Sequence, residues 1–527
     1  MKRRDFLAAA GVGSALSVLD WLSFFKRNGI PAGSKDLGIA ESVAQAADTN
    51  PNFLVYWFTE GGWDGFSMFN PVATKNAALE PNGDNPQIYR PNVPLVGGLY
   101  PVQQKGAISY GHLAQVGAAD PNLFNEMCVL SSHYGSEFHS GSRFEYHYGK
   151  YNFGLGRARA ADERTVMQAF CETYGQPFLI SNLHWHKWLA DGELSFGDYP
   201  EGTGYYEKLG PAYAHTLYAG TPQVMRDRIA AIAKSKGTGR DAAVHKFVDN
   251  LHNNFMKDKN SDSVRAFQSA VQIHTAFATG GASIDPASLF TDGALRTQFN
   301  VKAADEQTDS QSINGNPARS KDSPNTNVQA LMAYEMFTRG LSISAFIESR
   351  DIRGFDSHRN KAFVLQNKGQ YNQKGQMDAN LWNPLIAFRN ALKNKQYGAT
   401  GKSYWDFTTV VLASEMGRHM EGGDDDVAQH NKVNSCVFLG GKVKGGTQYG
   451  RAGAQSRDAI PILPDGSLDP AYDPATGFIK SGMQKSNSSF VPDAGHVYAT
   501  ALDLCGIPKA EQKGKNDRPV LSFVKKA

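Results

Sequence analysis

The sequence predicts an α/β protein built on a mostly parallel sheet with helices on both faces. Continuous apolar runs end in clusters of glycine and polar residues, which is typical of strands that are buried on both sides. Segments with helix-like apolar spacing separate these runs along the chain. Because strands that alternate with helices favour parallel pairing, the pattern indicates layers of helices around one sheet.

The clearest expected strand is the aromatic run at 53–58, and the clearest one in the C-terminal half is 408–413. The other expected strands are 127–130, 178–180, 343–347 and 437–439, and the expected helices are 165–174, 224–234, 242–255, 327–339, 382–393 and 497–505. We expect a helical insertion over about 222–300, an exposed polar loop at 302–326, and irregular loops at 71–118 and 444–490.

The N-terminus has the features of an export signal. Lys2-Arg3-Arg4-Asp5-Phe6-Leu7 is a twin-arginine pattern, an apolar stretch follows it, and Ala44-Gln45-Ala46 is a small-x-small cleavage pattern. We therefore expect a signal peptide at 1–46, recognised by the twin-arginine translocase, and one mature domain at 47–527 in the periplasm or outside the cell. The alternative is a basic arm followed by an amphipathic helix.

Charge and hydropathy narrow the classes of partner. Removal of residues 1–46 would lower the formal charge from +3 to +1, which gives no electrostatic reason to expect nucleic acid. No further apolar run is long enough for a membrane span, so we expect no stable span after cleavage. The four cysteines allow three disulfide pairings, and their spacing does not choose among them.

Polar residues with metal-binding side chains follow four of the expected strands. They are Asp64 after the first strand; His133, His139, Ser140 and Ser142 after the second; Asp356 and His358 after 343–347; and Glu415 and His430 after 408–413. Ligands collect beyond the carboxyl ends of strands in such folds, and carboxylates with imidazoles bind divalent metals. The spacing of two in Asp356/His358 would direct both side chains to one face of an extended segment.

Structural roles compete with these chemical ones. Asp64 could bind the amides of a glycine-rich turn, and Asp356 could cap the next segment. His184 and His186 flank Trp185 and could bind metal, but aromatic packing is the simpler interpretation. A solvated acidic loop is the simpler interpretation of residues 424–426.

Four motifs in order identify a family resemblance. They are Gly61-Gly-Trp-Asp-Gly65, Gly354-Phe-Asp-Ser-His358, Ser414-Glu-Met-Gly-Arg418 and Phe438-Leu-Gly-Gly-Lys-Val-Lys-Gly-Gly446. With them the chain resembles the DUF1501 family of proteins of unknown function, whose members look like distant relatives of alkaline phosphatases and sulfatases. The resemblance covers most of residues 52–508.

The resemblance implies a three-layer fold similar to alkaline phosphatase, with one or two divalent ions at the sheet edge, Zn or Ca being candidates. Asp64 would bridge toward the nucleophile's metal, Asp356 and His358 would bind the other, and His430 would complete the first site. The family usually has Asp before this histidine, whereas this chain has Gln429. The nucleophile position falls at His139 by spacing, with Ser140 beside it, and His496 lies where a late ligand could enter.

The sequence thus favours a metal-dependent hydrolase of small-molecule or glycan phosphate or sulfate esters. Ser140 would attack, and Arg143 could hold the anion's oxygens. The alternatives are an exported binding protein that kept the fold and lost part of the metal site, as Gln429 suggests, and a structural component of an envelope assembly.

Overall fold

The computed structural model describes residues 52–59, 62–63, 68–70, 102–137, 145–149, 164–175, 178, 180–185, 217–234, 285–303, 324–349, 378–418, 430–453, 458–512 and 516–526. No helix within these ranges has the length and apolar character needed to cross a bilayer.

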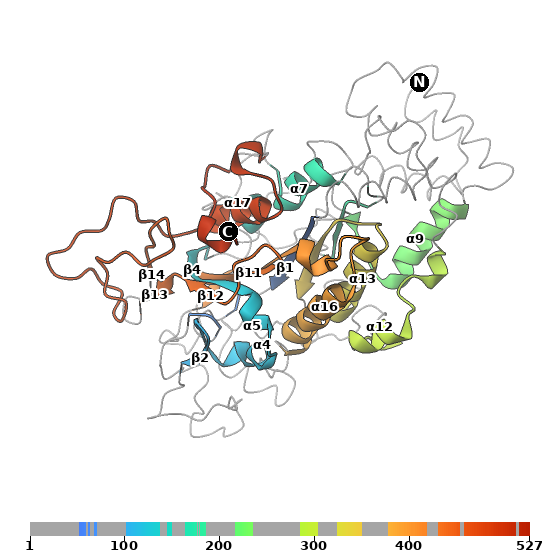
Figure 1. Cartoon of the computed structure of the whole chain (residues 1–527), viewed down its shortest axis with the longest axis horizontal. Coiled ribbons are helices and arrows are strands. Elements are labelled where there is room, and N and C mark those ends of the chain that lie inside the picture. The colour runs from blue at the N-terminus through green and yellow to red at the C-terminus, as the bar shows by residue number, and fades with distance from the viewer. Residues whose placement is uncertain are drawn as a thin grey trace, which may run out of the picture.

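An eight-stranded sheet forms the centre of the molecule (Figure 1). Its order from one edge to the other is β12 (Thr447–Tyr449), β4 (Met127–Tyr134), β11 (Val433–Gly440), β8 (Thr408–Ser414), β1 (Phe53–Thr59), β7 (Ser344–Ser349), β5 (Asn182–His184) and β6 (Leu217–Tyr218). Neighbouring strands pair in parallel except where β11 pairs antiparallel with β4 and β8. The carboxyl ends of β1, β4, β7 and β8 therefore share one edge with the amino end of β11.

Helices cover both faces of the sheet. Figure 1 places α7 (Val166–Tyr174) and α17 (Ala494–Leu504) on one side of the strands, and α13 (Thr326–Thr338) and α16 (Asn383–Asn394) on the other. The remaining elements are α4 (Gln115–Ala119), α5 (Leu123–Glu126), α9 (Pro222–Lys234), α12 (Gly293–Gln298), the hairpin β2 (Gln103–Lys105)–β3 (Ile108–Tyr110), the ribbon β9 (Gly417–Arg418)–β10 (His430–Asn431), the pair β13 (Arg451–Ala452)–β14 (Ala459–Ile460), the π-helix Asp378–Trp382 and 3-10 turns at His112–Ala114, Pro286–Ser288, Tyr404–Phe407, Lys509–Glu511 and Ser522–Val524.

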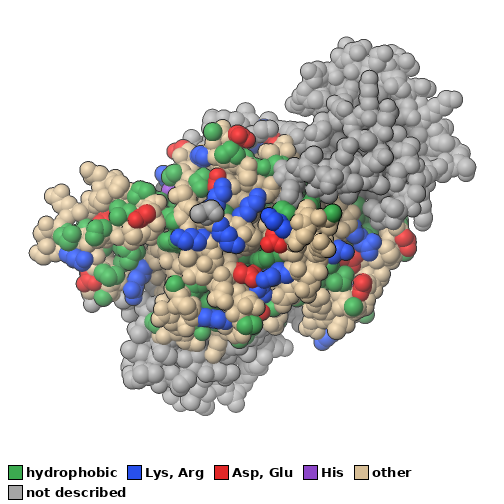
Figure 2. Space-filling view, viewed as in Figure 1, with side chains coloured by type: hydrophobic (Ala, Val, Ile, Leu, Met, Phe, Trp, Pro, Cys, Tyr) green, Lys and Arg blue, Asp and Glu red, His purple; other side chains and the backbone are tan. Residues whose placement is uncertain are grey.

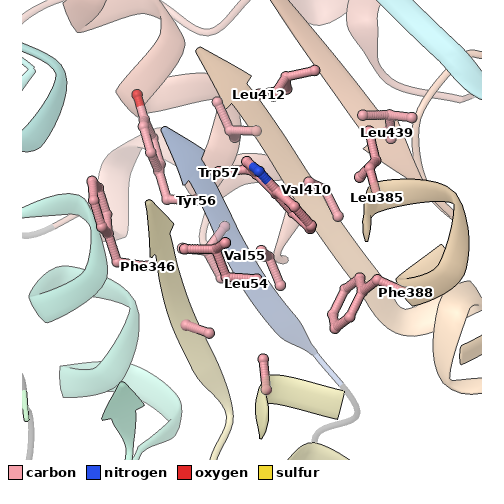
Figure 3. Packing of buried hydrophobic residues seen from close by; sticks show 14 of the residues in the cluster. Leu54, Val55, Tyr56, Trp57, Phe346, Leu385, Phe388, Val410, Leu412 and Leu439 are labelled. Carbon is pink, nitrogen blue, oxygen red and sulfur yellow. The ribbon is translucent and has the colours of Figure 1, made fainter. Parts of the chain in front are cut away.

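Strand β1 shows why the sequence forms this core. All seven of its residues are buried, and alternate side chains point to opposite faces. Trp57 meets Phe388 of α16 edge-on at 6.1 Å between ring centroids, whereas Tyr56 stacks on Phe346 of β7 at 5.7 Å on the other face (Figure 3). Helices on both sides thus require apolar residues at every position of the strand, which explains the unbroken hydrophobic run.

The expectation of an α/β fold with a mostly parallel, doubly covered sheet is confirmed. Several element boundaries were wrong. The strand expected at 178–180 begins instead at Asn182, because Phe178 and Ile180 lie in bends. The second strand continues to Tyr134, so His133 lies within β4 and not after it.

Two segments expected to be irregular loops contribute regular structure. Residues 103–119 form the β2–β3 hairpin and α4, and residues 447–449 form the edge strand β12, which pairs in parallel with β4. Each of these strands is only three residues long, which is too short to give a recognisable apolar or alternating run. The expected helix at 242–255 lies outside the described residues, and so does the expected polar loop at 302–326 apart from 302–303 and 324–326. The last residue of this loop, Thr326, begins α13.

All four cysteines are buried and free. Burial raises the pKa of both the Cys128 and Cys505 thiols to about 12, so these thiols are protonated at neutral pH. They act as small core side chains, and none of the three possible pairings is formed.

Candidate functional site

The described part of the predicted site lies at the carboxyl edge of the sheet. Glu415 and His430 are the predicted ligands within it. The other predicted site residues, together with Gln429, lie outside the described residues: Asp64, His139, Ser140, Arg143, Asp356 and His358.

A hydrogen-bonded junction joins the carboxyl ends of β1 and β8. The Ser414 hydroxyl donates to the Thr59 carbonyl at 3.0 Å and accepts the backbone amide of Trp63 at 2.8 Å. All three residues are fully buried. The junction therefore holds Trp63, the residue before Asp64, and Ser414, the residue before Glu415.

Glu415 is buried directly after this junction, and its amide donates to the Thr59 carbonyl at 3.4 Å. The chain then turns into the β9–β10 ribbon, in which His430 pairs with Arg418. The ribbon therefore returns His430 to a position opposite a residue only three positions beyond Glu415.

Gly417 makes this return possible. A Cβ atom at this position would lie 1.8 Å from the backbone oxygen of Val433, far inside van der Waals contact. The glycine in the Ser414-Glu-Met-Gly-Arg418 motif is thus required by the close approach of β9 to the start of β11.

The imidazole of His430 has a defined orientation. Its Nδ1 contacts the backbone carbonyl oxygen of Glu137, just beyond β4. A carbonyl can only accept, so Nδ1 carries the proton, and in the neutral ring the lone pair lies on the buried Nε2. This is the arrangement in which histidines commonly bind metals, with the second ring nitrogen held by a carbonyl or a carboxylate.

A second buried chain of polar groups connects β11 and β4 to the helical turn at 145–148. The Asn434 amide donates to the Ser414 carbonyl at 2.9 Å and to the Tyr146 hydroxyl at 3.2 Å, and that hydroxyl contacts His133 Nε2. Burial lowers the pKa of His133 to about 4, although the charge of Asp493 opposes the shift. His133 is therefore neutral at physiological pH, and its Nε2 accepts a hydrogen bond from the Tyr146 hydroxyl.

Asp493 and His496 lie beside this chain at the amino end of α17. The Asp493 carboxylate caps the helix through the amides of Gly495 and His496, contacts His496 Nδ1 at 2.8 Å and pairs with Arg518 Nε at 2.7 Å. Burial alone would raise the pKa of Asp493, but the His496 hydrogen bond and the Arg518 charge outweigh it and lower the pKa. His496, considered from sequence as a late ligand, thus has a helix-capping role through its Nδ1.

The model of the family described as "Protein of unknown function (DUF1501)" matches residues 177–460. The chain belongs to the DUF1501 family. No curated protein matches the sequence.

Two solved structures show distant likeness. One, titled "Structure of BT4656 in complex with its substrate D-Glucosamine-2-N, 6-O-disulfate", has 13% identity and a TM-score of 0.30, and the match covers 90% of this chain and 82% of that one. The other is the phosphonate monoester hydrolase of Agrobacterium radiobacter, with 11% identity, a TM-score of 0.27 and 82% and 79% coverage. Scores of this size assign neither fold nor activity.

The DUF1501 match includes three of the four sequence motifs, and the structure explains the glycines of the last one. Gly440 has φ 130°, and a Cβ there would lie 1.9 Å from the Thr408 carbonyl oxygen. A Cβ at Gly441 would lie 2.2 Å from the Asp406 carbonyl oxygen. This motif lies at the amino edge of β8, opposite the candidate site, so its glycines serve packing.

Other sequence candidates have structural roles or lie elsewhere. Trp185 is buried, and its indole nitrogen donates to the Gly220 carbonyl at 3.0 Å. His184 is buried in β5, and His186 and residues 424–426 lie outside the described residues. Within the described ranges, no three His, Cys, Asp or Glu side chains converge on a metal-binding position.

Sequence reasoning missed the polar chain through Asn434 and Tyr146. Both residues are polar side chains without a recognisable motif, and their partners are far away in sequence or across the sheet. The one available signal was His133, a histidine near the end of an apolar run, which was noted only as part of a cluster.

Proposed function

We propose that this DUF1501 protein is a metal-dependent hydrolase of phosphate or sulfate esters, with its site at the carboxyl edge of β1, β4 and β8. The observation that supports the proposal most strongly is the convergence of three segments there. The Ser414 junction sets Glu415 beside the end of β1, and the ribbon brings His430 back to this edge, where its ring contacts the chain beyond β4.

The donor chemistry of the described residues fits a divalent ion. Glu415 offers a buried carboxylate, and His430 offers Nε2 in the neutral tautomer. We propose that Asp64, Asp356 and His358 supply the remaining ligands. Such an ion, Zn or Ca being candidates, would lower the pKa of a hydroxyl nucleophile and stabilise negative charge on the leaving oxygen.

Chain connectivity supports a role for Asp64. Its neighbour Trp63 is fixed to Ser414 by a 2.8 Å hydrogen bond, and consecutive Cα atoms are about 3.8 Å apart. Trp63 and Ser414 form one hydrogen-bonded pair, and Asp64 and Glu415 are the next residues after them in the sequence. If both carboxylates enter the site, a divalent ion would offset the repulsion between their charges.

Connectivity also supports the proposed nucleophile segment. Residues 138–144 join Glu137, which contacts His430, to the turn whose Tyr146 is bound to Asn434. Both ends of the segment are thus held at the carboxyl edge. We propose that Ser140 attacks phosphorus or sulfur, that His139 neighbours it in the site, and that Arg143 holds the anion's remaining oxygens.

Ester hydrolysis by the mature chain, residues 47–527, tests the proposal. The substrates are 4-nitrophenyl phosphate and 4-nitrophenyl sulfate, with added Zn²⁺ or Ca²⁺. We expect turnover that falls at least 100-fold in Ser140→Ala and Glu415→Gln. Asp465→Asn, which changes an acid in an exposed turn, is the matched control and should leave the rate unchanged.

A well-folded protein without turnover on either ester class would contradict the hydrolase and favour the binding protein suggested by Gln429. Equal turnover in wild type and Glu415→Gln would contradict the site assignment alone. The first result tests whether the protein hydrolyses these esters, and the second tests where in the structure the reaction takes place.

We further propose export through the twin-arginine translocase to the periplasm or beyond. The proposal is supported by the order of arginine pair, apolar stretch and cleavage pattern in residues 1–46. Replacing Arg3 and Arg4 by Lys should leave the precursor inside the cytoplasm in a fractionation experiment. Unchanged export would contradict the route.

A further inference from the structure

Residues 461–490 form a lobe that projects from the body of the molecule between β14 and α17 (Figure 1). Among the described residues, the large hydrophobic side chains classed as exposed are Val102, Phe478, Ile479 and Met483. Three of these four lie within six consecutive positions of this lobe, with exposed fractions of 54% for Phe478, 46% for Ile479 and 43% for Met483. Figure 2 shows hydrophobic, basic and acidic side chains on the lobe.

The lobe presents these side chains on a hydrogen-bonded frame. Its base closes through two bonds between the backbones of Ile462 and Phe490, of 2.8 and 2.9 Å. The buried Asp469 carboxylate accepts the amides of Ala471 and Ser486, both at 2.9 Å, and so joins the two sides of the lobe. An apolar tip on such a frame is held outward and does not fold back onto the core.

The tip itself is a tight hairpin. The amide of Asp473 donates to the Phe478 carbonyl at 2.9 Å, and that of Lys480 donates to the Ala471 carbonyl at 2.9 Å. Gly477 closes the turn with φ 81° and a 2.7 Å bond to the Asp473 carbonyl. Every residue from 478 to 485 is exposed.

The charge around the tip is basic. Residues 474–490 contain Lys480 and Lys485, both exposed, and no Asp or Glu. Asp473, the nearest acid, turns its carboxylate to the amide of Ala475 at 2.8 Å. Residues 473–490 therefore contain two lysines and one aspartate, which gives the hairpin a net charge of +1. The Lys480 ammonium donates to the Pro470 carbonyl at 2.9 Å and stays exposed.

We infer that this tip docks on a lipid bilayer that contains anionic headgroups. The exposed hydrophobic residues of the tip lie within six consecutive positions of a projecting hairpin. A bilayer accepts a convex apolar tip without a complementary pocket, and lysines beside the tip interact with anionic headgroups. Insertion of the apolar side chains and attraction of the lysines to the headgroups would thus both contribute to binding.

Docking would orient the candidate site. The lobe begins and ends at the carboxyl edge of the sheet, where Phe490 stacks on His496 at 5.0 Å between centroids and Tyr134 of β4 bridges to Asp493. The bilayer would then lie beside this edge. The inference stands whether or not the protein hydrolyses esters, because it rests on the lobe alone.

Flotation of the mature chain with large unilamellar vesicles tests the inference. We expect it to bind vesicles of mixed phosphatidylglycerol and phosphatidylcholine and to bind pure phosphatidylcholine more weakly. Phe478→Ser/Ile479→Ser should weaken binding at least tenfold. Lys480→Gln/Lys485→Gln should weaken it by a factor of about five for each lysine on the anionic vesicles and have little effect on the neutral ones.

Val102→Ser is the matched control, because Val102 is a 40% exposed hydrophobic residue outside the lobe and should not affect flotation. Circular dichroism and thermal unfolding verify that each variant folds. No binding by the wild type, or equal binding by the Phe478→Ser/Ile479→Ser variant, would overturn the inference. A dimer of the wild type in light scattering that dissociates in the Phe478→Ser/Ile479→Ser variant would also overturn the inference, because the tip would then bind a second copy of the chain.

Discussion

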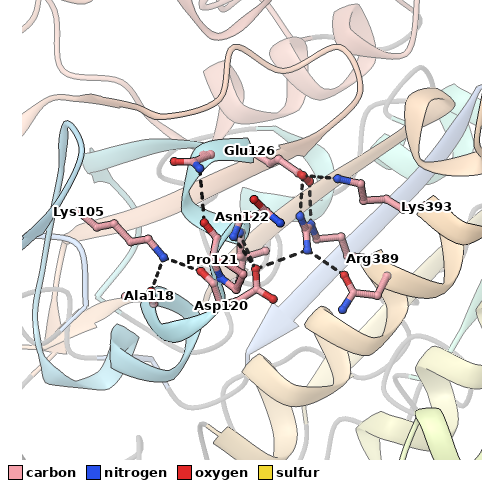
Figure 4. A network of polar contacts seen from close by, with 11 residues as sticks. Lys105, Ala118, Asp120, Pro121, Asn122, Glu126, Arg389 and Lys393 are labelled. Atoms are coloured by element: carbon pink, nitrogen blue, oxygen red, sulfur yellow. Dashed lines mark hydrogen bonds and ion pairs between the residues drawn. The ribbon is translucent and has the colours of Figure 1, made fainter.

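The ion pairs between α16 and the α4–α5 segment allow a quantitative test of the structure. Arg389 donates two hydrogen bonds to the Glu126 carboxylate, at 2.7 and 2.6 Å, and lies 3.5 Å from Asp120 (Figure 4). Lys393 binds the same carboxylate at 2.6 Å. The side chain of Arg389 is 3% exposed, whereas that of Lys393 is 39% exposed.

The two cations should therefore contribute very differently to stability. Arg389→Met removes two charge-assisted bonds and leaves Glu126 with Lys393 alone. Loss of one partner from a buried pair costs about 3–5 kcal/mol, but the remaining lysine and the 21% exposure of Glu126 reduce this to about 2–3 kcal/mol. Lys393→Ala should cost less than about 1 kcal/mol, because its pair is solvated.

The pH dependence of the same pair has a definite sign. Burial alone would raise the pKa of Glu126, but hydrogen bonds from Arg389 and Lys393 outweigh it and lower the pKa below its ordinary value. The folded protein then holds this proton less tightly than the unfolded chain. The stabilisation is complete above about pH 5 and is lost as the pH falls through the folded pKa.

Urea unfolding of the mature chain at pH 7 provides the assay, with Arg389→Met, Glu126→Gln and the double variant forming a cycle. We expect a coupling free energy of at least about 1.5 kcal/mol. Additive effects, or a larger loss from Lys393→Ala than from Arg389→Met, would refute the geometry of this network.

Three further changes test other parts of the fold. Gly417→Ala places a Cβ atom 1.8 Å from the Val433 oxygen and should cost more than about 3 kcal/mol in urea unfolding; a near-neutral result would refute the close approach of β9 to β11. Tyr146→Phe keeps the ring but removes the hydroxyl that Asn434 binds, so it should lower the free energy of unfolding by about 1–3 kcal/mol in the same assay. An unchanged free energy of unfolding would refute the hydrogen bonds from Asn434 through Tyr146. Burial lowers the pKa of His133 to about 4 from an ordinary 6.5, so about 3 kcal/mol of stability should be lost as the pH falls from 6.5 toward 4. His133→Gln should make the free energy of unfolding less dependent on pH in this range. An equal pH dependence in the variant would show that another group titrates there.

The buried strands could be predicted from the sequence because their environment is uniform. Residues 408–413 and 53–58 were located to within one residue at their ends, since helices on both faces make every position apolar. Strand β4 was cut short because Ser131, Ser132 and His133 are polar yet buried, and Tyr134 after them is half-buried. Ser131, for example, accepts a 2.6 Å bond from Gln448, a partner 317 positions away.

The sequence predicted at which edge of the sheet Glu415 and His430 would lie, and their role as metal ligands stays a prediction. Alternation of strands and helices indicated the carboxyl edge, and Glu415 and His430 do lie there. The chain from Asn434 through Tyr146 to His133 was not predictable, because it depends on strand order and on contacts across 288 positions. The requirement for glycine at position 417 could not be predicted either, since it follows from a contact between β9 and the start of β11.

Elemental analysis of the purified mature protein tests the central proposal most directly. We predict about two divalent ions per chain in the wild type and a reduced content in Glu415→Gln and His430→Ala, with Asp465→Asn unchanged. A folded protein that binds no divalent ion, or one whose metal content is the same in all four proteins, would contradict a metal site at the carboxyl edge.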